Sequence, residues 1–133
     1  MQEQWNEWTN EINGYLARLK VAGSLNDEFP WDYLDRFMEL VKIGGNNFEG
    51  IVQDGCVVEG NIHLGKKSRI LFPSVIIGSG YIGENVVVGP FAYLRGHFLI
   101  GDNTTVGRTE FKESIMLSGS HAAHFSYVGD SVI

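Results

Sequence analysis

The chain has 133 residues, a formal net charge of −6 and one cysteine. This length predicts one domain with a short appendage, and the acidic balance argues against nucleic acid or an anionic membrane as a partner. The lone Cys56 excludes a disulfide within the chain and is typical of a protein of the reducing cytoplasm.

Residues 1–45 are predicted to form an N-terminal segment of two helices. Apolar residues recur at intervals of three and four, first from Trp5 to Leu19 and again from Trp31 to Val41, which is typical of amphipathic helices. We expect both apolar stripes to pack on the body of the protein or on a neighbouring subunit. The polar faces carry more acid than base, so we expect no membrane association.

The period changes to six residues after this segment, and residues 46–133 are predicted to form a second unit. Ten consecutive positions at this spacing are aliphatic: Val52, Val58, Leu64, Ile70, Ile76, Ile82, Val88, Leu94, Ile100 and Val106. Glycine follows directly after five of them, at Gly65, Gly83, Gly89, Gly101 and Gly107. A fixed period of six predicts a solenoid of short strands and tight turns, with the aliphatic side chains inside. We expect the glycines to supply the backbone freedom that the turns require.

This repeat resembles the hexapeptide-repeat family of left-handed parallel β-helices, in which about three hexads make one triangular coil. The resemblance implies a mainly β protein. Residues 46–133 would form a left-handed parallel β-helix, and the two-helix segment would precede it.

The repeat is interrupted once, after Val106. The next position in phase holds Lys112, and the aliphatic rhythm resumes at Met116, four residues out of step with the earlier frame. We expect residues 107–115 to bulge out of the coil. Because a local departure from an otherwise regular pattern indicates a functional site, we expect the functional residues to lie beside this interruption.

Four polar residues are candidates for one site beside this interruption. His124 comes two places after Ala122 in the resumed frame, so its side chain is predicted to face outward. A single outward histidine is most often only a solvated polar residue. Arg95, Lys112 and Tyr127 are expected on the same side, however, and two cations beside a phenol and an imidazole are typical of an anion site with a base.

Three stretches carry a closer resemblance. They are "GPFAYLR" (89–95), "EFK" (110–112) and "HFSYVGDSVI" (124–133). They resemble the acetyltransferase domain of the bifunctional N-acetylglucosamine-1-phosphate uridyltransferase and glucosamine-1-phosphate acetyltransferase family, and that of related sugar-phosphate nucleotidyltransferases.

That resemblance implies roles for the four residues. Arg95, Lys112 and Tyr127 would hold an amino-sugar 1-phosphate, and His124 would deprotonate its amine for attack on the thioester of acetyl-CoA, the co-substrate. The resemblance also implies a homotrimer in the cytoplasm that serves UDP-N-acetylglucosamine biosynthesis and needs no metal in this segment.

The chain departs from the family pattern in three ways. It has no nucleotidyltransferase domain, so we expect no uridylyl transfer by this chain. The family's "LRPG" reads "LRG" here, with Gly96 in the place of proline. The family continues with further coils that carry most of the acetyl-CoA site. We therefore expect this chain to be a C-terminally truncated piece or a remnant of a longer protein, and inactive on its own.

Two other functions are weighed against acetyl transfer. A non-catalytic module for sugar-phosphate binding or trimerisation would use Arg95 and Lys112 in the same way. A metal enzyme is the third possibility, since γ-class carbonic anhydrases share this fold. It would need three histidines together, whereas His63 and His97 are predicted to lie coils away from His124.

Overall fold

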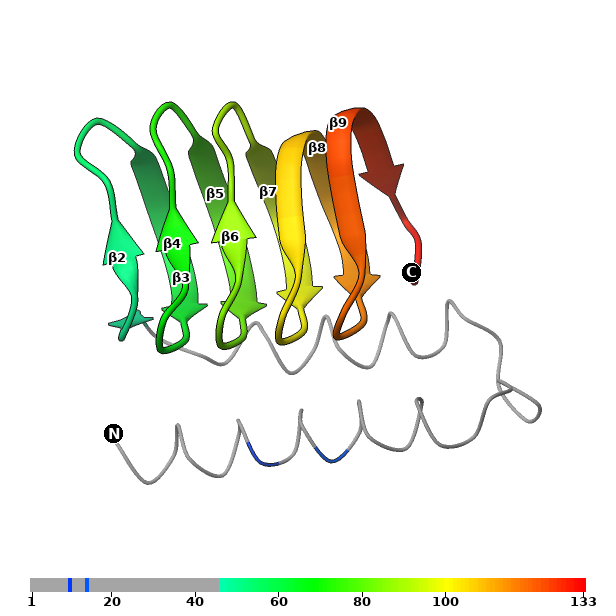
Figure 1. Ribbon diagram of the computed structural model, residues 1–133, viewed down its shortest axis with the longest axis horizontal. Helices are drawn as coiled ribbons and strands as arrows, with labels where there is room; N and C mark the ends of the chain where they lie inside the picture. Colours follow the sequence, from blue (N-terminus) through cyan, green and yellow to red (C-terminus); the bar gives the residue numbers. More distant parts are fainter. Residues whose placement is uncertain (1–9, 11–13, 15–45) are drawn as a thin grey trace.

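The computed structural model describes residues 10, 14 and 46–133, and residues 46–133 form one parallel sheet wound into a solenoid (Figure 1). The predicted parallel β-helix is confirmed. The predicted two-helix segment and its boundary at residue 45 lie outside the described residues. The strands are β1 (Asn47–Phe48), β2 (Ile51–Val52), β3 (Val57–Leu64), β4 (Arg69–Ile70), β5 (Val75–Ile82), β6 (Val87–Val88), β7 (Tyr93–Ile100), β8 (Thr105–Met116) and β9 (His121–Gly129).

Equivalent residues of successive coils pair with one another along two ladders. One ladder has the order β1-β3-β5-β7-β8 and the other the order β2-β4-β6-β8, and β9 pairs with β8. Strand β8 belongs to both ladders because it runs unbroken through the corner that separates β6 from β7 in the preceding coil. Polar residues on β7, β8 and β9 are therefore presented side by side.

The aliphatic repeat lines the interior as predicted. The eight aliphatic residues from Leu64 to Val106 at this spacing are all 0% exposed, while Val52 and Val58 are partly buried against the same core. Gly80 leaves room for the ring of Phe98 from the next coil, since a Cβ at this glycine would overlap that ring. Burial of this continuous apolar column is the main stabilising contribution to a solenoid.

The glycines of the repeat serve mainly close packing, which corrects the expectation that they supply turn freedom. Of the five, only Gly89 has a positive φ. The left-handed turn positions at the corner after Gly65 and Gly83 are held by Lys67 and Asn85, with φ of 62° and 55°. A Cβ at Gly65 would instead overlap the backbone of Gly83 in the next coil. At this corner, therefore, the neighbouring coils can approach as closely as they do because Gly65 lacks a side chain.

The interrupted segment stays in the coil, so the predicted bulge of residues 107–115 is wrong. Val88 pairs with Val106, Leu94 with Phe111 and Ile100 with Met116, so equivalent positions are 18, then 17, then 16 residues apart. One residue has been lost at each of two successive corners, so this coil contains fewer residues than the preceding one. Phe111, and not Lys112, takes the interior position, and it is 0% exposed.

The two outward faces formed by the long strands differ in access. Beyond the corner glycines, His63 and Tyr81 stack at 4.7 Å between ring centroids and are buried on one face. Burial lowers the pKa of the His63 imidazole and raises that of the Tyr81 phenol. On the other face, Tyr93 and Tyr127 remain exposed. This second face, on β7, β8 and β9, is therefore accessible to a ligand.

No helix in the described part of the chain is long and apolar enough to cross a membrane.

Candidate functional site

The open face brings Arg95 and Lys112 together. They are direct register partners on β7 and β8, so their side chains leave adjacent strands at the same level. Both are partly exposed. Neighbouring strands lie about 5 Å apart, so one phosphate group can reach both cations.

Each of these cations has a carboxylate partner. Arg95 Nε donates a hydrogen bond of 2.7 Å to Glu110 Oε1, and this bond raises the pKa of the guanidinium. Lys112 Nζ lies 3.8 Å from Asp130 Oδ2, and the Asp130 side chain is 68% exposed. Because both pairs are exposed to solvent, we expect each to contribute little to stability and to give way to a stronger anion.

Glu110 is the residue of this face that the sequence reasoning left without a role. It stands two positions before Lys112 in the strand, so both side chains project to the same side. It is in register with Tyr93 on one side and Tyr127 on the other. The stretch "EFK" contained the signal, but the ion pair with Arg95 depends on a register between coils that no local pattern encodes.

Tyr127 leans toward the position of Lys112. Its exposed ring lies over Gly129, where an added Cβ would overlap the phenol oxygen, and Gly129 is the register partner of Lys112. The hydroxyl therefore lies over the strand position that is in register with Lys112. Three of the four predicted residues, Arg95, Lys112 and Tyr127, are thus gathered on one face.

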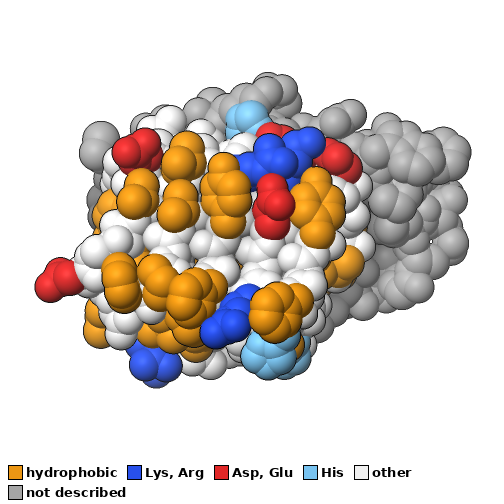
Figure 2. Space-filling view, turned by 90° about the horizontal axis from the view of Figure 1, so that it is seen from above, with side chains coloured by type: hydrophobic (Ala, Val, Ile, Leu, Met, Phe, Trp, Pro, Cys, Tyr) orange, Lys and Arg blue, Asp and Glu red, His pale blue; other side chains and the backbone are white. Residues whose placement is uncertain are grey.

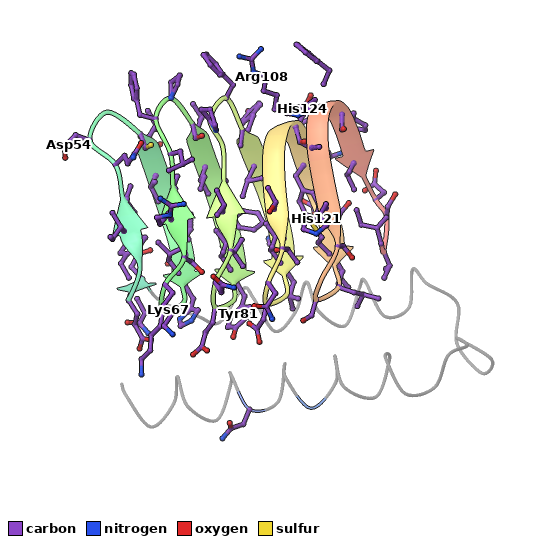
Figure 3. All side chains as sticks on the ribbon, in the orientation of Figure 1. Asp54, Lys67, Tyr81, Arg108, His121 and His124 are labelled. Carbon is purple, nitrogen blue, oxygen red and sulfur yellow. The ribbon has the colours of Figure 1, made fainter. Side chains whose placement is uncertain are left out.

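His124 lies at the adjoining corner. Its side chain is exposed, as expected of a position that points out of the solenoid, and its register partner is Arg108 on β8. Figure 3 shows His124 and Arg108 along the same edge of the solenoid, whereas His121 lies farther down β9. Phe125, in a left-handed conformation with φ of 49°, turns the chain between His124 and Tyr127.

A groove of about 360 Å³ lies where this corner meets the open face. Its lining residues are Phe91, Tyr93, Arg108, Thr109, Glu110 and Phe125. None of the four predicted residues lines it, but it includes the ion-pair partner of Arg95 and the register partner of His124. Mostly apolar walls with a few charged groups are typical of small-molecule sites.

Within residues 46–133 the structure contains no group of three or more His, Cys, Asp and Glu side chains that could hold a metal ion.

The period, the all-parallel pairing and the aliphatic interior define the described residues as a hexapeptide-repeat β-helix domain. The chain is homologous to proteins named bifunctional protein GlmU. It is 34% identical to the one from Methanocaldococcus jannaschii over 134 aligned positions, which cover 96% of this chain and 33% of that protein. It is 33% identical to the one from Clostridium novyi over 95 positions, covering 67% of this chain and 21% of that protein.

A third homologue of that name, from Clostridium botulinum, is 31% identical over 109 positions, covering 70% of this chain and 23% of that protein. The chain thus spans about a third or less of the length of the curated relatives it matches. No protein-family model matches it.

Proposed function

We propose that this β-helix belongs to an acetyltransferase that transfers the acetyl group of acetyl-CoA to the amine of an amino-sugar 1-phosphate, of the glucosamine 1-phosphate type. The observation that carries the proposal is the pairing of Arg95 with Lys112 in adjacent coils, with Tyr127 leaning toward them. The homology to proteins named bifunctional protein GlmU supports it.

The residues supply the two things that the reaction needs. The cations bind the sugar phosphate, because a guanidinium offers a planar fork to phosphate oxygens and an ammonium adds a point charge. His124 accepts a proton from the sugar ammonium, since only the free amine can attack a carbonyl carbon. A C–N bond forms, the C–S bond of the thioester breaks, and the thiolate of coenzyme A leaves and takes up a proton.

A substrate phosphate can displace the carboxylates from both ion pairs of the open face. A phosphate placed between Arg95 and Lys112 would compete with Glu110 and Asp130, both partly or largely exposed. Glu110, released from Arg95, would remain beside the sugar and could accept hydrogen bonds from its hydroxyl or ammonium groups. Because phosphate offers more acceptor oxygens and more charge than a carboxylate, the exchange favours the ligand.

Arg95→Ala is expected to weaken the binding of glucosamine 1-phosphate by about tenfold or more, the loss typical of one charge-assisted hydrogen-bond pair. Titration calorimetry on the full-length protein measures this. Arg69→Ala is the matched control, because Arg69 is exposed on β4, away from the open face. Glucosamine without its phosphate should bind both variants alike, and an unchanged affinity of Arg95→Ala for the sugar phosphate would contradict the proposed phosphate site.

We also propose that the protein is a homotrimer of the cytoplasm that acts in UDP-N-acetylglucosamine biosynthesis. Exposed apolar side chains gather on the open face and its corner, among charged ones, and support the association (Figure 2). Its members, each at least 40% exposed, are Val57, Phe72, Ile77, Phe91, Tyr93, Phe125 and Tyr127. The single cysteine, partly buried and unpaired, fits a reducing compartment.

The trimer is tested by light scattering at micromolar concentration. The 133-residue chain should have three times its monomer mass of 14.8 kDa. Phe125→Ser, which removes the most exposed aromatic side chain of this surface, should shift the equilibrium toward monomer. A stable monomer of the unmodified chain at that concentration would rule the trimer out.

A further inference from the structure

The corner at Arg108 is built differently from the same corner in the coils on either side. Val106 and Phe111 are five residues apart, whereas Val88 and Leu94, their partners in the preceding coil, are six apart. The coil before has Phe91 at this corner, with φ of 62°, and the coil after has Phe125, with φ of 49°. The coil between them has lost one corner residue and has no aromatic ring there.

Arg108 occupies the gap that this loss leaves. Its guanidinium carbon lies 4.7 Å from the centre of the Phe91 ring and 5.5 Å from that of the Phe125 ring, so it is held between two aromatic faces. Such stacking attracts a cation and restricts a long, otherwise mobile side chain. It uses the flat faces of the guanidinium and leaves the N–H groups at its edge available as donors.

Among the described residues, Arg108 differs from the other two cations of the site in having no acid partner. Arg95 is paired with Glu110 and Lys112 with Asp130. Among residues 46–133, no carboxylate lies within 4.0 Å of the Arg108 guanidinium. A restrained guanidinium beside apolar rings, without a counter-ion of its own, is arranged to receive an anion from outside the chain.

The neighbours of Arg108 place that anion at the candidate site. Arg108 is the register partner of His124, and it lines the groove together with Glu110, the partner of Arg95. The rings of Phe91 and Phe125 cover the flat sides of the guanidinium, and Arg108 is otherwise exposed, so the edge of the guanidinium is accessible to an anion in the groove.

We propose that Arg108 is a phosphate-binding residue of this site, held by Phe91 and Phe125 so that a substrate phosphate in the groove lies next to His124. The planar fork of the guanidinium matches two phosphate oxygens. The phosphate could belong to the sugar phosphate or to coenzyme A, and the chemistry of recognition is the same for both. The inference rests on the proposed function in its choice of substrates.

Binding measurements on the full-length protein separate these sources. Arg108→Gln removes the charge, Arg108→Lys keeps the charge without the planar fork, and Arg69→Gln is the control on an exposed arginine of β4. Each protein is titrated with glucosamine 1-phosphate and with coenzyme A, and also with glucosamine and pantetheine, which lack the phosphate groups. Inorganic pyrophosphate serves as a probe that needs neither substrate.

Arg108→Gln is expected to weaken the binding of at least one phosphate-bearing substrate by about tenfold or more. Arg108→Lys should recover part of this affinity, and the affinity for the phosphate-free compounds should not change in either variant. A loss confined to glucosamine 1-phosphate assigns Arg108 to the sugar, and a loss confined to coenzyme A assigns it to the acyl donor. Pyrophosphate binding that depends on Arg108 would support the site even if acetyl transfer were absent, so the two proposals can fail separately. The inference would be overturned if Arg108→Gln bound every phosphate-bearing probe as tightly as the unmodified protein does. It would also be overturned if the unmodified protein bound none of these probes.

Discussion

Replacing Phe111 by alanine is expected to lower the free energy of unfolding by about 3–5 kcal/mol, the cost of emptying a fully buried aromatic position. Phe111 is 0% exposed and continues the interior column after Leu94, its register partner. The surrounding core relaxes only partly around such a truncation, so a cavity remains. Urea or thermal denaturation at one fixed protein concentration measures the loss, because association with other copies would make stability depend on concentration.

Lys112→Ala is the matched control for this prediction. Lys112 is the adjacent residue on β8, projects outward and pairs with the largely exposed Asp130. Its removal should cost less than about 1 kcal/mol, as exposed ion pairs contribute little. If Lys112→Ala were the more destabilising of the two, the register of β8 described here would be wrong, and the six-residue frame would continue through Lys112.

Replacing His124 by alanine is expected to slow acetyl transfer by about 10²–10⁴-fold, the usual cost of removing a general base. Sugar-phosphate binding should survive, because Arg95, Lys112 and Tyr127 lie on the other side of the corner from His124. The loss should therefore appear in kcat, with little change in the affinity for glucosamine 1-phosphate. Steady-state kinetics of the full-length protein, together with calorimetry, separate the two quantities.

His121→Ala is the control for this substitution. His121 is also exposed on β9, but its register partner is Thr105, on the part of β8 that pairs with the short strand β6. It contacts neither the groove nor the paired cations. Loss of turnover in His121→Ala with normal turnover in His124→Ala would reverse the assignment of the base.

The coil could be predicted from the sequence because its interior repeats. An inward aliphatic residue every six positions leaves few ways to bury all of them, and the residues from Leu64 to Val106 lie in the core as expected. The frame also predicted correctly that His124 points outward. A repeated pattern therefore predicts those features that every coil shares, such as which positions face the interior.

The interruption could not be resolved in the same way. The change of phase predicted a bulge of residues 107–115 out of the coil, with Lys112 on the outward face, but it did not show which residue takes the interior position in this coil. The structure divides the loss between two corners, which places Phe111 inside. An apolar side chain gains more from burial than an ammonium, which would need a partner there.

The side-chain contacts between coils could not be predicted from the sequence either. The ion pair of Arg95 with Glu110 joins residues that are neighbours only because one coil is shorter than 18 residues. The position of Arg108 between Phe91 and Phe125 depends on the same shortening. Both follow from register, which is set by the whole coil and not by any local motif.

Acetylation of glucosamine 1-phosphate by the full-length protein is the decisive test of the proposed acetyltransferase function. With acetyl-CoA as donor, we expect formation of N-acetylglucosamine 1-phosphate and release of one free thiol of coenzyme A for each product. Glucose 1-phosphate, which has the phosphate but no amine, should bind and not react. A folded protein that binds glucosamine 1-phosphate and acetyl-CoA but forms no acetylated sugar would contradict the account.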